Sequence, residues 1–427
     1  MKNKLQSILI LVFLISMISC VKNEQKEDDV LKTKKDLTAA DILGNPKYLA
    51  ISYGGYRENT REIQPTINQL KEDLKIMHAM GIRILRTYNV QPKLPHASNV
   101  LKAISELKKE DSSFEMYVML GAWIDCLNAW TDKAPNHEIE SPNNEGEIAR
   151  AVALAKQYPD IVKIIAVGNE AMVTWATSYF VRPNVILKWV NHLQDLKKSG
   201  ELSKDLWITS SDDFSSWGGG DASYKVKDLE DLIKSVDYVS MHTYPYHYSH
   251  YVSAFWKVPE EEKDLSVVEK ADKAMLRAAD NAKQLYHKVV DYVKTIDSTK
   301  TVHIGETGWA SISDGHYGKD GSRASDEYKQ GLYYKHMREW TNAEGVSCFY
   351  FEAFDEQWKD AANPNGSENH FGLINLKGEA KYPIWNLVDQ GIFDGLERNG
   401  KKITKSFNGD KDALLKTVME PNTDYPK

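Results

Sequence analysis

The stretch TVHIGETGWA, residues 301–310, has the pattern of a short buried β-strand that ends on a carboxylate. Val302 and Ile304 alternate with smaller or polar residues, and this period of two predicts that Glu306 lies on the same face. The glycines and the threonine around Glu306 interrupt the apolar run, so we expect the strand to end there. An acid at the end of a buried strand costs free energy unless it has a partner or a function.

A second stretch, IVKIIAVGNE at residues 161–170, repeats this form. The same alternation predicts one shared face for Val162, Ile164, Ala166, Gly168 and Glu170. Hydrolysis of a glycosidic bond uses two carboxyl groups that flank the bond, and two strands that each end on a glutamate can supply them. The structural alternatives are that Glu170 stabilises the start of a helix and that Glu306 pairs with a buried arginine.

Strands and helices alternate along the rest of the chain. Apolar runs predict strands over residues 48–56, 82–89, 114–124, 161–170, 206–214, 236–246, 301–310 and 346–356. Helices are predicted over 65–80, 99–109, 145–158, 184–199, 227–235 and 326–341, with another ending near 296 and a last one starting near 383. Eight such units of uniform composition predict a parallel sheet closed into a (β/α)8 TIM barrel, formed by a single domain over 46–427. The alternative is an open doubly wound sheet, although SYGGY after the first strand lacks the G-x-G-x-x-G spacing.

The barrel predicts where the two glutamates meet. Active sites of such barrels lie at the carboxyl ends of the strands, where Glu170 and Glu306 both fall. The fourth and seventh strands lie across the barrel mouth from each other, so the carboxylates can face one another over a bound sugar. A retaining hydrolase holds its pair about 5–5.5 Å apart, whereas an inverting one needs a wider gap.

The composition excludes several other classes of function. The 427 residues carry a net charge of −7, which argues against binding to nucleic acid or to an anionic membrane surface. The 11 tryptophans and 22 tyrosines fit either a carbohydrate-binding surface or a large aromatic core. Cys126 and Cys348 are predicted to be small buried residues rather than a disulfide framework. No Cys/His spacing indicates zinc, so we expect neither a metal nor a cofactor.

Residues 1–20 resemble a bacterial lipoprotein signal peptide. Lys2 and Lys4 precede an apolar run over residues 8–15, which is too short to remain as a membrane-spanning helix. The run leads to Ser19 and Cys20, and the resemblance implies that Cys20 is acylated and becomes the first residue of the mature chain. The alternative is an ordinary secretory signal with a chance cysteine.

Residues 21–45 are polar and charged, and this composition predicts a flexible tether between the lipid and the folded domain. We therefore expect a lipid-anchored protein of the bacterial cell envelope. It would sit at the outer membrane and face either the periplasm or the cell surface.

Six motifs occur in order at the predicted strand ends. They are ISYGGY, LRTYN, GNE, HTYPYH, GETGW and FEAFDEQWK, the last followed by ENHFGLINLKGEAKYP. This ordered set resembles glycoside hydrolase family 17, the β-1,3-glucanases of glycosidase clan A, from the first strand to about Trp385. The resemblance implies a barrel fold, a β-1,3-glucan substrate and a retaining mechanism without a cofactor.

The resemblance also implies a role for each matching residue. Glu170 would be the general acid/base and Glu306 the nucleophile. Asn169 would bond to the sugar 2-hydroxyl, and Tyr244 would donate to Glu306 and keep it ionised. The other matches are two polar residues near the nucleophile and four aromatic residues that contact the sugar or support the site: Glu356, Lys359, Tyr53, Tyr88, Trp309 and Phe371.

The aromatic matches at the strand ends predict a platform for sugar rings, built from Tyr88 and Trp309. The structural alternative is that Tyr244 and Trp309 are core aromatics.

Two departures from the family pattern bear on the shape of the site. Ala310 stands where the family usually has proline, and an insertion over 247–267, with Tyr248, Tyr251, Phe255 and Trp256, could reshape the cleft.

The alternation of side chains along the strands predicts the positions and roles of four further residues. Arg86 is expected to orient the carboxylates as a buried ion pair. His242 shares a face with Tyr244 and is a candidate for the same network. His303 points the other way and is expected to pack on the outer face of the barrel. Glu352 faces inward, where support of the site and contact with substrate both stay open.

These features predict a monomeric, lipid-anchored, retaining endo-β-1,3-glucanase that hydrolyses laminarin-like glucan. A β-1,3-glucanosyltransferase of the same family is one alternative, and it differs only in which acceptor attacks the intermediate. A non-catalytic glycan-binding lipoprotein is the other, although both carboxylates are present. Endo and exo action are not distinguished by the sequence.

Overall fold

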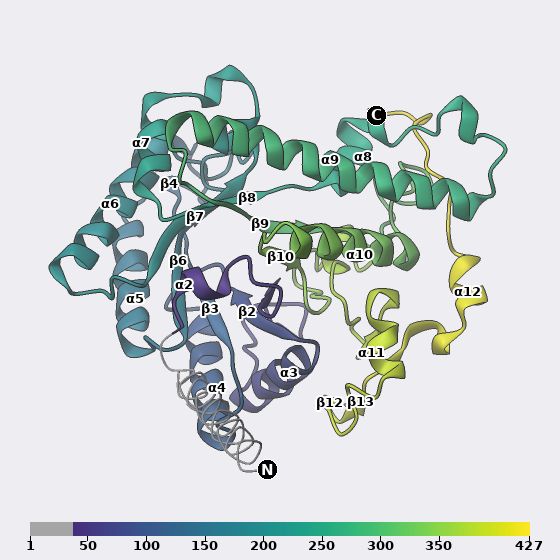
Figure 1. Ribbon diagram of the computed structural model, residues 1–427, viewed down its shortest axis with the longest axis horizontal. Helices are drawn as coiled ribbons and strands as arrows, with labels where there is room; N and C mark the ends of the chain where they lie inside the picture. The colour runs from purple at the N-terminus through teal and green to yellow at the C-terminus, as the bar shows by residue number, and fades with distance from the viewer. Residues whose placement is uncertain (1–36) are drawn as a thin grey trace, which may run out of the picture.

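The computed structural model describes residues 37–427, in which eight parallel strands close into a barrel (Figure 1). The order around the barrel is β1-β10-β9-β8-β7-β6-β3-β2, and the first and last of these strands pair to close the sheet. The predicted (β/α)8 TIM barrel is therefore confirmed. The barrel strands are β1 Leu49–Ser52, β2 Ile82–Arg86, β3 Tyr117–Ala122, β6 Val162–Asn169, β7 Trp207–Asp213, β8 Val239–His242, β9 Val302–Gly308 and β10 Cys348–Phe351.

Seven long helices connect the strands within residues 37–427. Local sequence signals fix their ends: the Thr66 side chain accepts from the Gln69 amide at the start of α3, and Gly200 at φ 82° ends α6. The helices are α3 Ile67–Ala79, α4 His96–Glu110, α5 Asn144–Gln157, α6 Pro183–Ser199, α7 Lys227–Ser235, α9 Val267–Ile296 and α10 Glu327–Ala343.

The eighth strand is followed by a different kind of connection. The helix expected near residue 383 is only the short α11 Trp385–Asp389, and α12 Lys411–Leu415 comes later. Two small sheets brace this part, one pairing β11 Glu379–Ala380 with β14 Thr404–Lys405 and one pairing β12 Glu397–Arg398 with β13 Lys401–Lys402. Figure 1 shows α11, α12 and the β12–β13 pair at one side of the barrel.

Two apolar layers hold the barrel together. The larger lies between the strands and the surrounding helices. The smaller fills the inside of the barrel at the amino ends of the strands. The short helix α2 Ala39–Ile42 closes that end, with Ala39 and Ile42 fully buried against the inner layer. The expectation of a tether that extends to residue 45 is therefore wrong for residues 37–45, because burial of these apolar side chains stabilises their place in the folded domain.

An irregularity in strand pairing brings Glu306 to the barrel mouth. Met241 pairs with Ile304 and His242 pairs with Glu306, so β9 carries one extra residue between these two pairs. An extra residue reverses the side to which the following side chains point. Ile304 packs in the outer layer, whereas Glu306 contacts side chains of the barrel interior. The predicted common face of Ile304 and Glu306 is therefore wrong.

The same kind of irregularity occurs in β6. Ala166 pairs with Thr209 and Asn169 pairs with Ser211, again with one extra residue before the glutamate. Ala166 belongs to the inner layer, whereas a Cβ added at Gly168 would meet side chains of the outer layer. The predicted single face over residues 162–170 is thus interrupted, and Asn169 as well as Glu170 reaches the mouth.

His303 corrects a further expectation. Its Nδ1 accepts from the Ser347 amide at 3.0 Å, and its ring lies 5.5 Å from that of Tyr238, a residue of the inner layer. His303 therefore lies inside the barrel rather than on its outer face, and burial lowers its pKa to about 4.

Further features of the fold had no counterpart in the predicted elements. A hairpin of β4 Cys126–Leu127 and β5 Asn136–Glu140 follows β3, and α8 Pro245–Tyr251 opens the insertion after β8. The end of the chain returns to this insertion and lies near α8 (Figure 1). There the Tyr425 hydroxyl lies 2.9 Å from Nδ1 of His250.

Cys126 and Cys348 are both free and buried, as predicted. Within residues 37–427, none of the helices combines the length and the apolar composition that crossing a membrane requires. The predicted signal peptide over 1–20, the acylated Cys20 and the tether up to residue 36 lie outside the described residues.

Candidate active site

Glu170 and Glu306 face each other at the barrel mouth. Glu170 follows β6 directly, with its backbone at φ 46°, and its amide donates to the Ser211 carbonyl at 2.9 Å. Glu306 lies within β9. One side-chain atom each of Glu170, Glu306 and His242 lie within 4.8 Å of one another. The two carboxyl groups are thus closer together than the roughly 6.5–9.5 Å that an inverting pair requires.

Glu306 is surrounded by groups that favour its ionised form. Arg86 from the end of β2 is almost fully buried and donates to Oε2 of Glu306, and the Tyr244 hydroxyl donates to Oε1 at 2.5 Å. Burial alone would raise the pKa of Glu306, but Arg86, His242 and Tyr244 together bring the pKa below the ordinary value for a glutamate. Glu306 is therefore a carboxylate near neutral pH.

Glu170 has the opposite environment. Its side chain is 18% exposed, and its Oε1 lies 3.0 Å from Nδ1 of His242. Burial, followed by the negative charge of Glu306, raises the pKa of Glu170 well above the ordinary value. Two neighbouring carboxyl groups with pKa values pushed apart are the arrangement that separates an acid from a nucleophile.

His242 links the two carboxyl groups, which agrees with its predicted membership of the network. Its Nε2 lies 3.3 Å from Nη2 of Arg86 and 2.7 Å from Oγ of Ser211. Arg86 can only donate, so Nε2 accepts and Nδ1 carries the proton in the neutral ring. Burial lowers the pKa of His242 to about 4, which keeps the ring neutral. Nδ1–H therefore donates to Oε1 of Glu170 and leaves Oε2 to carry the acid proton.

Asn169 is oriented by the same guanidinium. Nη2 of Arg86 donates to Oδ1 of Asn169, so the amide NH2 group of Asn169 points away from Arg86 and can donate to a ligand. The guanidinium carbon of Arg86 also lies 4.6 Å from the centre of the Tyr88 ring. Arg86 thus contacts and orients Glu306, Asn169 and Tyr88, which agrees with its predicted orienting role.

An open cleft runs across the mouth and has two halves that meet at Glu306, Phe351 and Glu368. One half, here called the acid half, is lined by Glu170 and has a volume of about 870 Å³. The other, here called the amide half, is lined by Asn169 and has a volume of about 740 Å³. Glu306, with Glu170 beside it, therefore lies in the middle of a long groove rather than at its end.

Most of the predicted substrate-binding residues line this cleft. Tyr88, Glu356 and Lys359 line the amide half, and Tyr244 and Phe371 line the acid half. Lys359 is nearly buried and donates to Glu352 at 2.6 Å. Glu352 is therefore a supporting residue that holds Lys359 rather than a lining residue.

Two of the predicted aromatic residues lie behind the cleft. The Tyr53 hydroxyl donates to Oδ2 of the buried Asp73 at 3.1 Å, so Tyr53 supports the end of β1. Trp309 is fully buried, and its indole donates to the Ala324 carbonyl at 2.8 Å. The expectation that Trp309 offers a flat face to a sugar is wrong, because surrounding aromatic side chains such as Tyr333 cover its ring.

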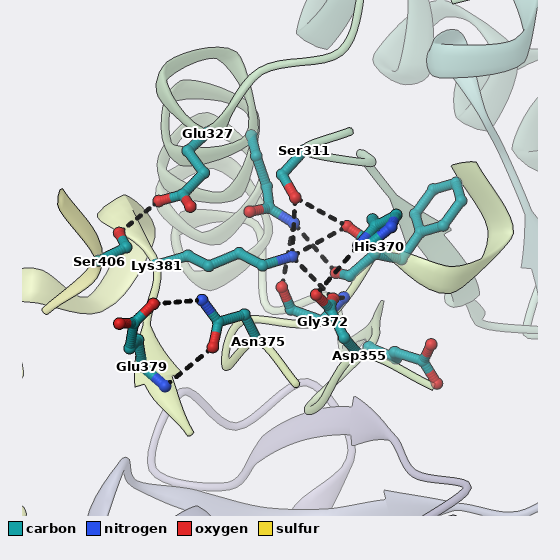
Figure 2. Close-up of polar contacts among 12 residues, drawn as sticks. Ser311, Glu327, Asp355, His370, Gly372, Asn375, Glu379, Lys381 and Ser406 are labelled. Carbon is teal, nitrogen blue, oxygen red and sulfur yellow. Dashed lines mark hydrogen bonds and ion pairs between the residues drawn. The ribbon is translucent and has the colours of Figure 1, made fainter. Parts of the chain in front are cut away.

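The loop after β10 is held by a buried ion pair. The Lys381 ammonium lies 2.7 Å from Oδ1 of Asp355, and both side chains are almost inaccessible. Figure 2 shows this ammonium group pointing toward Ser311, His370 and Asp355, with the Ser311 hydroxyl at 2.8 Å. Asp355 precedes Glu356, and His370 precedes Phe371, so the cluster positions two lining residues from behind.

Several lining residues were missed by the sequence analysis. Glu368 lies where the two halves meet. It belongs to the motif that begins ENHFG, whose resemblance to the family assigned a role to Phe371 but none to Glu368. Trp123 and Trp130 line the amide half, and Trp175 lines the acid half. These tryptophans lie in connections after β3 and β6, where no periodic pattern indicates which way a side chain points. The high tryptophan content was the only sequence signal for them.

Side-chain atoms of Glu170, His242 and Glu306 are close enough together to be considered as ligands of one metal ion. Arg86 donates to Glu306 and lies 3.3 Å from His242, so its fixed positive charge would oppose a cation placed among these three residues. The donor set therefore fits a proton-transfer site better than a metal site. Independence from metal stays a prediction for experiment.

Comparison with known proteins agrees with this geometry. The profile of the BtgE/BtgC glycoside hydrolase domain matches residues 50–372. The chain is similar to an endo-laminarinase from Formosa Hel1_33_131, with 62% identity and a TM-score of 0.89 over 92% of this chain and 100% of that chain. It is 26% identical over 273 residues to a glucan 1,3-beta-glucosidase of Arthroderma benhamiae, which covers 62% of this chain and 70% of that protein.

A more distant structure shares the fold alone. It is a glycoside hydrolase family 17 β-1,3-glucanosyltransferase from Rhizomucor miehei, 19% identical with a TM-score of 0.54 over 79% of this chain and 96% of that chain. The family profile spans both glutamates and most of the barrel. The chain therefore belongs to the BtgE/BtgC glycoside hydrolase family, and the resemblance of its strand-end motifs to glycoside hydrolase family 17 is confirmed.

Proposed function

We propose that this glycoside hydrolase is an endo-β-1,3-glucanase that cleaves laminarin-like glucan with retention of the anomeric configuration. The similarity to the Formosa endo-laminarinase over its whole length supports the substrate and the reaction. The observation that carries the mechanism is the close pair of carboxyl groups, within 4.8 Å, in opposite protonation states.

In the first step Glu306 attacks the anomeric carbon while Glu170 gives its proton to the departing oxygen. Arg86 and Tyr244 hold the attacking carboxylate in place and ionised. The result is a covalent glycosyl–enzyme and a Glu170 carboxylate.

In the second step the Glu170 carboxylate takes a proton from water, and the hydroxide attacks the same carbon and releases Glu306. His242 keeps Oε1 of Glu170 in position through both steps, since its donated hydrogen bond suits a neutral or an ionised carboxyl group.

The lining of the cleft gives the bound chain a direction. The acid must reach the oxygen that departs, so the acid half receives the leaving part of the glucan, on the reducing-end side. The amide half receives the part that becomes attached to Glu306, on the non-reducing side, where Asn169 and Tyr88 can contact the sugar. Because both halves are open grooves, internal bonds can be placed at Glu306, which favours endo action.

The function is tested by measuring reducing sugar released from linear β-1,3-glucan, mixed-linkage glucan and β-1,4-glucan, with separation of the products by length. The proposal expects rapid release from the β-1,3-glucan with a range of oligosaccharides from the start. Release of glucose alone would contradict endo action, and preference for the β-1,4 polymer would contradict the linkage.

A β-1,3-glucanosyltransferase is the second candidate. The volume of the acid half, about 870 Å³, and its aromatic lining would suit an acceptor sugar in place of water. Products longer than a laminari-oligosaccharide substrate would identify this reaction. A non-catalytic glycan-binding role is disfavoured, because both carboxylates are in place in a member of a glycoside hydrolase family.

We propose further that Cys20 carries a lipid anchor and that the enzyme acts as a monomer in the bacterial cell envelope. The support for the anchor is Lys2 and Lys4, the short apolar run and the Ser19–Cys20 junction. Cys20→Ala should release the protein from the membrane fraction, and retention there would contradict the anchor. The mass of the purified domain in solution, measured by light scattering, tests the monomer.

A further inference from the structure

The four most exposed large apolar side chains among residues 37–427 all line the cleft. Tyr251 is 65% exposed, Trp130 63%, and Trp175 and Val252 61% each. Trp130 lies in the amide half, and the other three lie in the acid half. Exposure of large apolar groups is unfavourable in water, so their concentration at one groove indicates a ligand that covers them.

Trp130 is held in its exposed position by the hairpin of β4 and β5. Its backbone adopts φ 61°, a left-handed conformation that costs free energy for a bulky residue. Its ring is stacked on Tyr179, with centroids 5.0 Å apart and planes at 23°, and lies 6.3 Å from the ring of Trp123, yet Trp130 is still 63% exposed. The Thr131 hydroxyl donates to the Asn128 carbonyl at 2.8 Å and closes the turn beneath it.

The acid half has its exposed aromatic residues on two separate connections. Trp175 comes from the loop after β6 that begins at Glu170, and the Thr177 amide donates to the Trp175 carbonyl at 2.8 Å within that loop. Tyr251 is the last residue of α8 in the insertion after β8. Both rings therefore lie on the leaving side of the catalytic pair, opposite to Trp130.

We propose that Trp130 and Trp175 are sugar-stacking residues at opposite ends of the cleft, and that they set the length and register of the bound chain. Pyranose rings present flat C–H faces that pack on an indole, and Trp130 and Trp175 are the exposed indoles in their two halves. Trp130 holds the non-reducing part of the glucan, and Trp175, with Tyr251, holds the reducing-end part. This inference rests on the proposed β-1,3-glucanase function and adds to it the residues that select chain length.

The test uses laminari-oligosaccharides of defined length that carry 18O at the reducing end, with mass spectrometry of the products. Trp130→Ala weakens binding of the non-reducing part, so the oligosaccharide binds with fewer sugars in the amide half. The cleaved bond therefore moves toward the non-reducing end. Trp175→Ala moves the cut toward the reducing end. In each variant kcat/KM should fall roughly two- to tenfold on long oligosaccharides, by analogy with aromatic pairs, and should fall less on short ones.

Matched controls separate stacking from disturbance of the loops. Ile139→Ala removes an exposed apolar side chain from the same hairpin as Trp130, and Thr177→Ala changes the loop of Trp175. Both controls should keep the wild-type cleavage pattern, and Trp130→Phe should restore most of the loss seen with Trp130→Ala because it returns a ring.

An unchanged cleavage pattern in both tryptophan variants, or shifts in the same direction, would overturn the inference. Either of these outcomes is distinct from failure of the proposed function, in which the wild-type enzyme would not cleave these oligosaccharides at all.

Discussion

At the residue scale, the fold places two identical side chains in opposite chemical states. Glu306 contacts a guanidinium and a phenol, whereas Glu170 accepts from a neutral imidazole and lies beside a negative charge. Arg86 is central to this difference, since it donates to Glu306 and also orients Asn169. In the proposed mechanism the acid and the nucleophile are therefore distinguished by their neighbours rather than by their own chemistry.

The pH dependence of activity follows from these shifts. The proposed mechanism predicts activity between the lowered pKa of Glu306, below which the nucleophile is protonated, and the raised pKa of Glu170, above which the acid is lost. Arg86→Met removes the positive charge that favours ionised Glu306, so the acidic limb of kcat/KM should move to higher pH. Activity at the optimum should fall roughly ten- to hundredfold, because hydrogen bonds to charged groups contribute about 1.5–3 kcal/mol.

Two controls accompany the pH profile of Arg86→Met. Arg86→Lys keeps the charge and should keep the acidic limb closer to its wild-type position. Arg83→Met changes an arginine of the same strand that donates to the His78 carbonyl instead of to the site. An acidic limb that stays in place in Arg86→Met would show that the charge does not control Glu306.

At the element scale, connections rather than barrel strands shape the cleft. The loop after β10 carries Glu356 and Phe371, and the Lys381–Asp355 ion pair fixes it from the inside (Figure 2). A buried pair of this kind adds little net stability compared with apolar packing, but loss of one partner leaves an uncompensated charge. The ion pair therefore holds the loop in this position, because separation of the two buried groups costs free energy.

Lys381→Met should lower the free energy of unfolding by about 3–5 kcal/mol, since Asp355 then stays buried without its cation. Urea unfolding of the purified domain measures this change. Lys377→Met, at an exposed position in the neighbouring turn, is the matched control and should be close to neutral. Equal stability of the two variants would mean that Asp355 is adequately satisfied by Gly372 and His370 alone.

At the scale of the whole molecule, the connections after the barrel strands, including the insertion after β8, form one groove with Glu306 at its middle. The last residues of the chain contact two of these connections: the Asn422 amide donates to the Ser322 carbonyl after β9 at 3.1 Å, and Tyr425 contacts His250 of the insertion. The residues that line the acid half run from Glu170 after β6 to Phe371 after β10. This half is therefore built by segments far apart in sequence, which explains why its shape was not predicted.

Catalysis by the whole enzyme should not need a metal ion, because Arg86 supplies the positive charge beside Glu306. Treatment with a chelator followed by dialysis should leave kcat/KM on linear β-1,3-glucan unchanged. Activity lost on chelation and recovered with a divalent cation would contradict this. A change in thermal stability without a change in activity would instead indicate an ion bound away from the site.

The sequence predicted the barrel, both glutamates and the contacts of Glu306 with Tyr244 and Arg86, because apolar runs and strand-end motifs are local signals. It did not predict the extra residue in β9. Gly305 is needed inside the barrel, where an added Cβ would lie 2.1 Å from Oγ of Ser240, and this close packing is a property of the closed sheet. A period of two cannot reveal such an interruption.

The aromatic residues show the same limit. Trp309 follows a strand end, as a lining residue would, yet it is covered by Tyr246 and Trp256 of the insertion and by Tyr333 of α10. Trp130 has no strand pattern around it and is nevertheless exposed at the groove. Which side of an aromatic residue faces solvent depends on segments that pack from elsewhere in the chain.

The most direct test of the assignment of Glu306 and Glu170 is the configuration of the glycosyl azide formed by two variants on an activated β-glucoside substrate. Glu306→Ala opens a space on the side of the nucleophile, so azide should restore turnover and give the α-configured product. Glu170→Ala should still form the covalent intermediate, and azide should then give the β-configured product. The reverse configurations would exchange the two roles and contradict the mechanism proposed for this site.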